Sequence, residues 1–81
     1  MSFKHRVLSI SSEGIRERSE TWNSLYSWDE VESLEFREKY FFMMLEYHRG
    51  FIVPHRVFPN EADMKVYVDQ AKRYLRDSSK N

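Results

Sequence analysis

The C-terminal part of the chain carries the pattern that most restricts its fold: one amphipathic helix, predicted from about Glu61 to Arg76. Asn60 is the predicted N-cap, because its side-chain oxygen can accept a hydrogen bond from a free N–H group of the first turn. Apolar residues recur at helical spacing and form one stripe along this helix: Met64, Tyr67, Val68, Ala71, Tyr74 and Leu75. Such a stripe needs another apolar layer to cover it, and the preceding residues must provide that layer.

The residues before the helix predict antiparallel strands. The predicted strands occupy residues 5–11, 15–21, the end of 22–28, 40–47 and 51–58. Residues 29–37 fit either one helical turn running into a strand or a strand alone, and we favour a strand from about Ser33. The predicted fold class is therefore α+β, with a curved antiparallel sheet of four to five strands covered by the C-terminal helix.

Two residues fix where strands turn or end. Gly14 follows the first predicted strand and can take the positive φ that a hairpin turn usually demands. Pro54 has no backbone N–H to give to a sheet, so it marks an edge strand or a bulge.

With 81 residues the chain is expected to form a single domain, residues 1–81, with its core at about 5–76 and a frayed tail at 77–81. It contains no cysteine, which excludes disulfides, thiolate zinc sites and cysteine nucleophiles and suits a reducing compartment. The 13 basic and 13 acidic residues cancel, whereas nucleic-acid binding needs a basic surplus, so no nucleic-acid partner is expected. No apolar run approaches the roughly 20 residues that span a bilayer, and the first ten residues lack the apolar stretch of a signal peptide.

The residue types used in catalysis do not form recognisable motifs. The histidines His5, His48 and His55 lack the close spacing of metal ligands, although His48 and His55 flank one predicted hairpin and could approach each other across it. No serine lies in a G-x-S-x-G nucleophile turn, and two glycines are too few for a phosphate-binding loop. We therefore expect no catalytic residues, no cofactor and no metal.

Four basic residues are candidates for surface contact: His48, Arg49, His55 and Arg56. At one end of a hairpin they could touch anionic lipid, at about 1 kcal/mol per basic residue near the surface. The alternative is a solvated hairpin without a ligand. The first hairpin has Glu13 and no basic residue at its tip, so phosphoinositide recognition is not supported.

The segment from Tyr40 to Tyr47 is apolar on both faces of its predicted strand. Phe41, Met43 and Leu45 lie on one face, and the candidate self-association residues lie on the other: Tyr40, Phe42 and Met44. One helix covers only one face of a sheet. Either the first strands close over the second face, or that face is left for a partner, and we expect weak homodimerisation.

The two tryptophans, Trp22 and Trp28, lie within seven positions of each other. They could form a recognition surface or anchor a small core. We favour the second interpretation for both, because a buried indole contributes several kcal/mol at roughly 25 cal/mol per Å².

Three short stretches carry a resemblance to a known family: "SSEGI", the W-D-E-V step from Trp28 to Val31, and "IVPHRVF" from Ile52 to Phe58. With them, roughly Val7 to Leu75 resembles the YcxB-like family of bacterial proteins. The resemblance implies a pleckstrin-homology-like curved sheet, a partly open barrel closed by the C-terminal helix. It also places Trp28 at the bend before Val31, beneath that helix.

Members of that family usually carry this domain after two transmembrane helices, on the cytoplasmic side. The printed sequence lacks the membrane segment, so it looks like a fragment or a stand-alone version. The family has no established activity, and the resemblance therefore transfers no catalytic residues. What it implies is a non-catalytic interaction or regulatory module with a protein partner, at the cytoplasmic face of a membrane. The alternative is a peripheral domain that binds anionic lipid headgroups.

Overall fold

The computed structural model describes residues 2–3 and 5–78, and these residues form seven strands, two short 3-10 turns and one helix. In chain order the elements are β1 (Ser2–Phe3), β2 (Arg6–Ser11), β3 (Gly14–Arg18), β4 (Asn23–Tyr26), η1 (Trp28–Glu30), β5 (Val31–Arg37), β6 (Tyr40–Leu45), β7 (Arg49–Pro54), η2 (His55–Val57) and α1 (Glu61–Ser78). The predicted α+β class with antiparallel strands and one C-terminal helix is confirmed.

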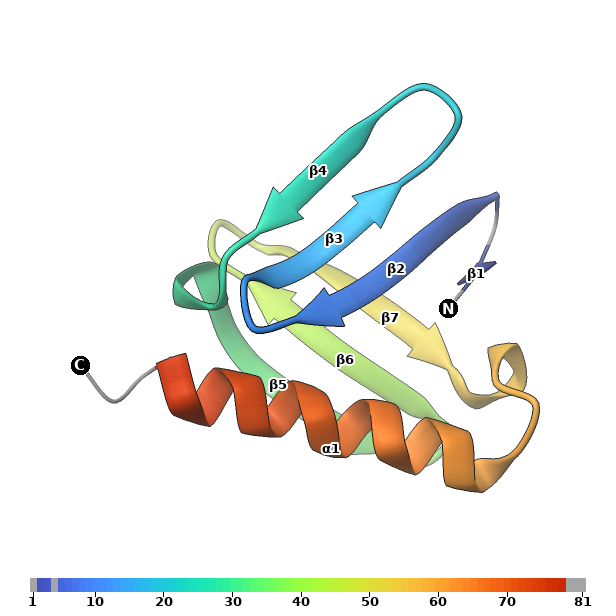
Figure 1. Cartoon of the computed structure of the whole chain (residues 1–81). Helices are drawn as coiled ribbons and strands as arrows, with labels where there is room; N and C mark the ends of the chain where they lie inside the picture. Colours follow the sequence, from blue (N-terminus) through green and yellow to red (C-terminus); the bar gives the residue numbers. More distant parts are fainter. Residues whose placement is uncertain (1, 4, 79–81) are drawn as a thin grey trace.

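The strands form two separate sheets, so the prediction of a single curved sheet with four to five strands is wrong. The first sheet has the order β1-β2-β3-β4, and the second has the order β5-β6-β7. All neighbouring strands are antiparallel. Figure 1 shows the first sheet above the second, with α1 running along the lower side of the molecule.

The break between the sheets is made by the short turn η1. The backbone N–H of Ser27 donates to Oε2 of Glu30 at 2.9 Å, and the N–H of Glu30 donates to the carbonyl of Ser27 at 3.0 Å. These bonds close a helical turn between β4 and β5, so β5 leaves in a new direction and pairs with β6 instead of β4. The helical turn weighed for residues 29–37 does form, but it starts at Trp28 and the strand follows at Val31.

Two features of the structure require glycine at position 14: its positive φ, which the sequence predicts, and the close approach of a neighbouring strand. Its φ is 148°, in the region that favours glycine. A Cβ atom at this position would also lie 2.1 Å from the carbonyl oxygen of Tyr26 on the neighbouring strand. Close approach of β3 and β4 therefore requires glycine here. Pro54 ends β7, which lies at the edge of its sheet as expected.

The hydrophobic core lies between the two sheets and α1. Its members come from the first sheet (Leu8, Ile15), from η1 and the second sheet (Trp28, Val31, Phe41, Met43, Leu45, Phe51, Val53) and from the helix (Met64, Val68, Ala71). The first sheet and the helix both cover the face of β6 that carries Phe41. The opposite face, with Tyr40 and Phe42, is left to solvent, so the alternative in which the first strands close over it is wrong.

Trp28 is the anchor that the sequence predicts. It is 3% exposed, and its indole Nε1 donates to the carbonyl of Ser11 at 2.7 Å. Its ring also lies 5.8 Å from that of Tyr74 in α1, between ring centroids. Trp28 thus joins η1, the end of β2 and the helix.

Trp22 is not an anchor, and this part of the prediction is wrong. It is 51% exposed in the connection between β3 and β4. The turn there is closed by Ser19, whose Oγ accepts from the N–H groups of Thr21 and Trp22 at 3.1 Å and 3.2 Å. Trp22 therefore lies in an exposed turn and is not among the residues of the core.

The helix α1 begins where the sequence predicts. The N–H of Asp63 donates to Oδ1 of Asn60 at 2.8 Å, which is the expected N-cap bond. The helix continues to Ser78, so residues 77 and 78 are helical and not part of a frayed tail. The rest of the predicted tail lies outside the described residues.

Candidate functional site

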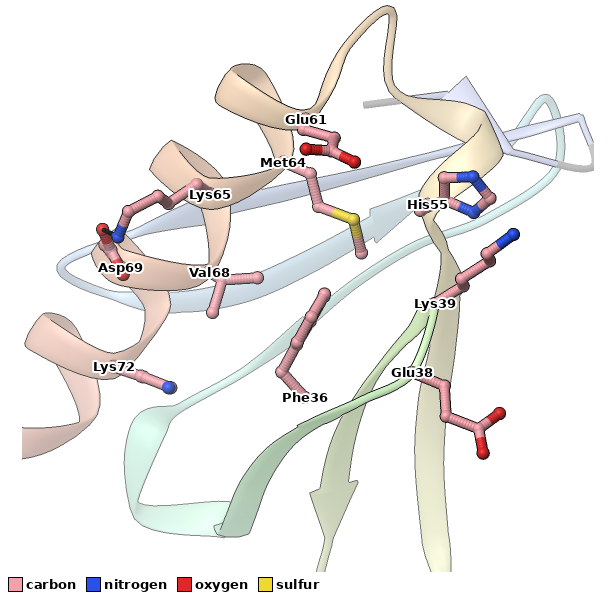
Figure 2. A pocket seen from close by; sticks show the side chains of 10 residues that line it. All are labelled: Phe36, Glu38, Lys39, His55, Glu61, Met64, Lys65, Val68, Asp69 and Lys72. Atoms are coloured by element: carbon pink, nitrogen blue, oxygen red, sulfur yellow. Dashed lines mark hydrogen bonds and ion pairs between the residues drawn. The ribbon is translucent and has the colours of Figure 1, made fainter.

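An open groove lies between α1 and the C-terminal end of β5 (Figure 2). Its volume is about 570 Å³, within the range of roughly 300–1,000 Å³ typical of ligand sites. The lining residues are Phe36, Glu38, Lys39, His55, Glu61, Met64, Lys65, Val68, Asp69 and Lys72. Helix side chains form one wall, while β5 and the β5–β6 turn form the other.

The floor of the groove is apolar because α1 leaves one core-facing aromatic ring uncovered. Phe36 is paired with Phe41, and directly opposite residues of neighbouring strands share a face of the sheet. Phe41 is fully buried, whereas Phe36 is 45% exposed. Figure 2 shows the Phe36 ring directed towards Met64 and Val68 of the helix. Met64 and Val68 are themselves buried, so the exposed part of the floor is the Phe36 ring.

The charges around this floor are only partly neutralised. Nζ of Lys65 lies 2.9 Å from Oδ2 of Asp69, so these two residues pair along the helix. The side chain of Glu38 is turned away from the groove in Figure 2. Lys39 and Lys72 have no ion pair within residues 2–3 and 5–78. Figure 2 also shows the Lys39 amino group directed away from Phe36, so Lys72 is the lysine that lies on the helix side of the floor.

The backbone beside the groove is also available. In the described part of the chain β5 pairs with β6 alone, so its other side is a free sheet edge. Opposite residues in antiparallel strands alternate between bonded and non-bonded pairs, so alternate residues of β5 direct N–H and C=O groups to this edge. A register shift between Val31 and Ser33 disturbs the start of β5, while the pairing from Ser33 to Arg37 is regular. The regular part of the edge lies next to the groove.

The four basic residues proposed for surface contact are not brought together. His48 and Arg49 lie at the β6–β7 turn, whereas His55 and Arg56 lie in η2 at the opposite end of β7. The strand between them has 6 residues, which at roughly 3.3 Å per residue separates its ends by about 17–20 Å. His48 and His55 therefore do not approach each other across the hairpin.

Two of these basic residues already have structural contacts. The side chain of Arg49 contacts the Glu46 carbonyl at 3.3 Å, a Glu30 carboxylate oxygen at 3.6 Å and the Tyr26 ring at 5.4 Å. The backbone N–H of His55 donates to the carbonyl of Lys39 at 2.8 Å and ties η2 to the β5–β6 turn. His55 consequently becomes part of the groove and not of a basic cluster.

The candidate self-association residues do share one surface. Tyr40, Phe42 and Met44 lie on the outer face of β6, and Ile52 of β7, paired with Phe42, is 52% exposed beside them. The Tyr40 and Phe42 rings are 6.4 Å apart, and the guanidinium of Arg37 lies 5.1 Å from the Phe42 ring centroid. We call Tyr40, Phe42, Met44 and Ile52 the outer apolar face.

One buried charge escaped the sequence interpretation. Glu17 of β3 is buried, and its carboxylate accepts a hydrogen bond from the guanidinium of Arg6 on β2. The same guanidinium lies 5.9 Å from the Phe51 ring centroid. Pairing with the Arg6 guanidinium lowers the cost of burying the Glu17 carboxylate. The contact therefore helps the first sheet pack against the second.

The groove also escaped the sequence interpretation. The available signal was Phe36, an apolar residue between Glu35 and Arg37 at the end of β5. Among residues 2–3 and 5–78 there is no group of three or more His, Asp or Glu side chains placed to hold a metal ion. None of the helices described here is long and apolar enough to cross a membrane.

Comparison with protein families gives one result. The family model described as "YcxB-like protein" matches residues 10–71 of this chain. Curated proteins and solved structures gave no match.

Proposed function

The chain belongs to the YcxB-like protein family, and on that premise we propose that it is a non-catalytic interaction module that binds a partner in the groove between α1 and β5. The observation that carries this proposal is the uncovered Phe36 ring. A core-facing aromatic that is 45% exposed loses much of the free energy that burial provides. A partner seated in the groove would recover it.

The chemistry of the groove favours binding over catalysis. Its ten lining residues supply amines, carboxylates, one imidazole and apolar groups, but no hydroxyl or thiol nucleophile. The groove is open along β5, and an open site does not exclude water from a reacting bond.

We also propose the finer features that the resemblance implies. A four-stranded and a three-stranded antiparallel sheet followed by one helix support a pleckstrin-homology-like arrangement. A position at the cytoplasmic face of a membrane in the full-length protein rests on the family resemblance. The headgroup-binding alternative loses its stated basis, because its four basic residues lie at opposite ends of β7.

The proposal is tested by selecting binders from a displayed library of random linear peptides. The chain itself is the bait, and two serine substitutions serve as a matched pair. Phe36→Ser removes the groove floor, whereas Val66→Ser changes a similarly exposed apolar residue of α1 that does not line the groove. We expect selected peptides to lose at least about tenfold in affinity for F36S and to keep their affinity for V66S. Failure to select any binder, or equal binding to F36S, contradicts the proposal.

A further inference from the structure

We propose that β4 is a self-association site, at which the β4 strands of two copies of this chain pair antiparallel about a two-fold axis at Ser24. The contact lies on the first sheet, so it is separate from the groove and from the outer apolar face. Three features of β4 support it: an unprotected edge, free backbone groups that match those of a second copy, and an exposed tryptophan beside it.

β4 is an edge strand of the first sheet, and its sequence does not protect that edge. In the described part of the chain β4 pairs with β3 alone, and Figure 1 shows it as the outermost strand of the sheet. Edge strands are usually protected by charged residues, proline or a bulge. Residues 21–27 contain no charged residue and no proline, and β4 pairs with β3 without a register shift.

The outer strands of the second sheet carry such protection. β5 contains Glu32, Glu35 and Arg37 and has an irregular start, and β7 ends at Pro54. β4 is therefore the better edge for another strand, because no charge or proline opposes its addition.

The hydrogen bonds of the β3–β4 turn show which backbone groups of β4 are free. The N–H of Ser19 donates to the carbonyl of Trp22 at 2.9 Å, so these residues form the hydrogen-bonded pair that closes the turn. Bonded and non-bonded pairs alternate along an antiparallel ladder. Asn23 and Leu25 therefore direct their N–H and C=O groups to the free edge.

The residues beyond Asn23 and Leu25 use their backbone groups elsewhere. The N–H of Thr21 donates to a serine hydroxyl of the turn at 3.1 Å. The N–H and C=O of Ser27 both bond to Glu30 and close η1. An incoming strand thus meets free groups at Asn23 and Leu25.

A second copy of β4 offers the matching set of groups. When Asn23 of each copy lies opposite Leu25 of the other, both residues exchange N–H and C=O bonds across the edge. Ser24 then lies opposite Ser24 of the second copy, on the two-fold axis of an isologous dimer. Any other antiparallel register leaves Asn23 or Leu25 opposite a residue whose N–H is already bonded.

The same register covers Trp22, which is 51% exposed. Trp22, Ser24 and Tyr26 share one face because side chains alternate along a strand. Trp22 of each copy then lies opposite Tyr26 of the other, in a non-hydrogen-bonded pair, where side chains approach most closely. The Tyr26 ring is already held by the Phe51 ring at 5.7 Å and the Arg49 guanidinium at 5.4 Å. Two aromatic pairs thus add to the main-chain bonds.

The test is disulfide trapping, which suits a chain that contains no cysteine. Ser24→Cys places a thiol on the two-fold axis, where opposite Cα atoms would lie about 4.5 Å apart, within reach of a disulfide. Ser9→Cys is the matched control, because Ser9 lies on β2, away from the edge, and is more exposed than Ser24. In a glutathione buffer at equal concentration, S24C should give at least about tenfold more disulfide dimer than S9C. Equal linking, or more linking in S9C, overturns the inference.

A second measurement separates this contact from the outer apolar face. In the ¹⁵N-labelled Phe42→Lys chain, the amide shifts of Asn23 and Leu25 should change between micromolar and millimolar concentration. Adding Trp22→Ala should weaken this association at least about fivefold, whereas adding Val66→Ser should change it by less than about twofold. Shifts at β4 that do not depend on concentration would leave this edge to a strand of another protein and overturn the inference, as would an unchanged association in Trp22→Ala.

Discussion

Replacement of Trp28 by alanine should be among the most damaging single changes in the chain. Trp28 of η1 is 3% exposed and contacts two other parts of the fold: the end of β2 through the Ser11 carbonyl, and α1 through the Tyr74 ring. The substitution would remove an indole from the place where both sheets and the helix meet. It would also leave the Ser11 carbonyl without its indole donor.

The expected cost follows from burial and from the hydrogen bond. A buried indole removes about 150–250 Å² from water, which at roughly 25 cal/mol per Å² gives an upper bound of about 4–6 kcal/mol. Measured truncations of buried aromatics to alanine cost about 3–5 kcal/mol, and we expect the same for Trp28→Ala. If the parent domain is stable by about 5 kcal/mol, the variant keeps about 0–2 kcal/mol, so between about 3% and 50% of it should be unfolded at 25 °C. Trp28→Phe keeps a ring but loses the donor and should cost about 1–3 kcal/mol.

Urea unfolding followed by circular dichroism measures these costs, with Trp22→Ala as the matched control. Trp22 is 51% exposed, so its removal should change the free energy of unfolding by less than about 0.5 kcal/mol. In a Trp22→Phe background, emission comes from Trp28 alone and should be blue-shifted and poorly quenched by iodide. A Trp28→Ala variant within about 1 kcal/mol of its parent, or free quenching of Trp28, would refute this reasoning.

Three further predictions address pH, association and the helix. Burial raises the pKa of the Tyr67 phenol far above its usual value, so the folded chain keeps a proton that the unfolded chain loses. The free energy of unfolding should therefore not depend on this phenol below about pH 10, and should fall by up to about 1.4 kcal/mol per pH unit above that pH. Urea unfolding at several pH values tests this, and an equal pH dependence in Tyr67→Phe contradicts it. The outer apolar face should form weak dimers with a dissociation constant in the high micromolar to millimolar range, and Phe42→Lys should abolish these dimers. Sedimentation equilibrium measures the association, and a strict monomer for the parent chain rejects this prediction. Deletion of everything after Pro59 should abolish cooperative unfolding, and a sharp melting transition in the shortened chain would disprove the role of α1.

The elements that could be predicted from the sequence are those that local chemistry decides. The helix begins after Asn60 because the Asn60 side chain caps its first turn. The apolar stripe of the helix faces the core because its side chains need an apolar layer, which the sheets provide. The alternation in β6 separates buried Phe41 from outward-facing Phe42 because side chains of a strand point to opposite faces. Each of these inferences needs only residues close together in the sequence.

The features that could not be predicted depend on where elements lie relative to one another. Glu30 reads as one charge among several in a bend, yet its bond to Ser27 helps separate the two sheets. Trp22 and Trp28 have similar neighbours in sequence, but only Trp28 lies where the helix meets both sheets. The groove exists because α1 passes beside Phe36 and does not cover it, and helical periodicity contains no information about that offset.

The order of the elements along the chain has a consequence for synthesis. Every described strand precedes α1, so the residues of both sheets emerge from the ribosome before those of the helix that covers them. At about 5–20 residues per second, the 18 residues of α1 correspond to roughly 1–4 s of synthesis. Until α1 has emerged, the core-facing side chains of β5 and β6 have only the first sheet to cover them. The nascent chain therefore passes through a stage in which the whole strip that α1 later covers, and not only Phe36, can attract other chains.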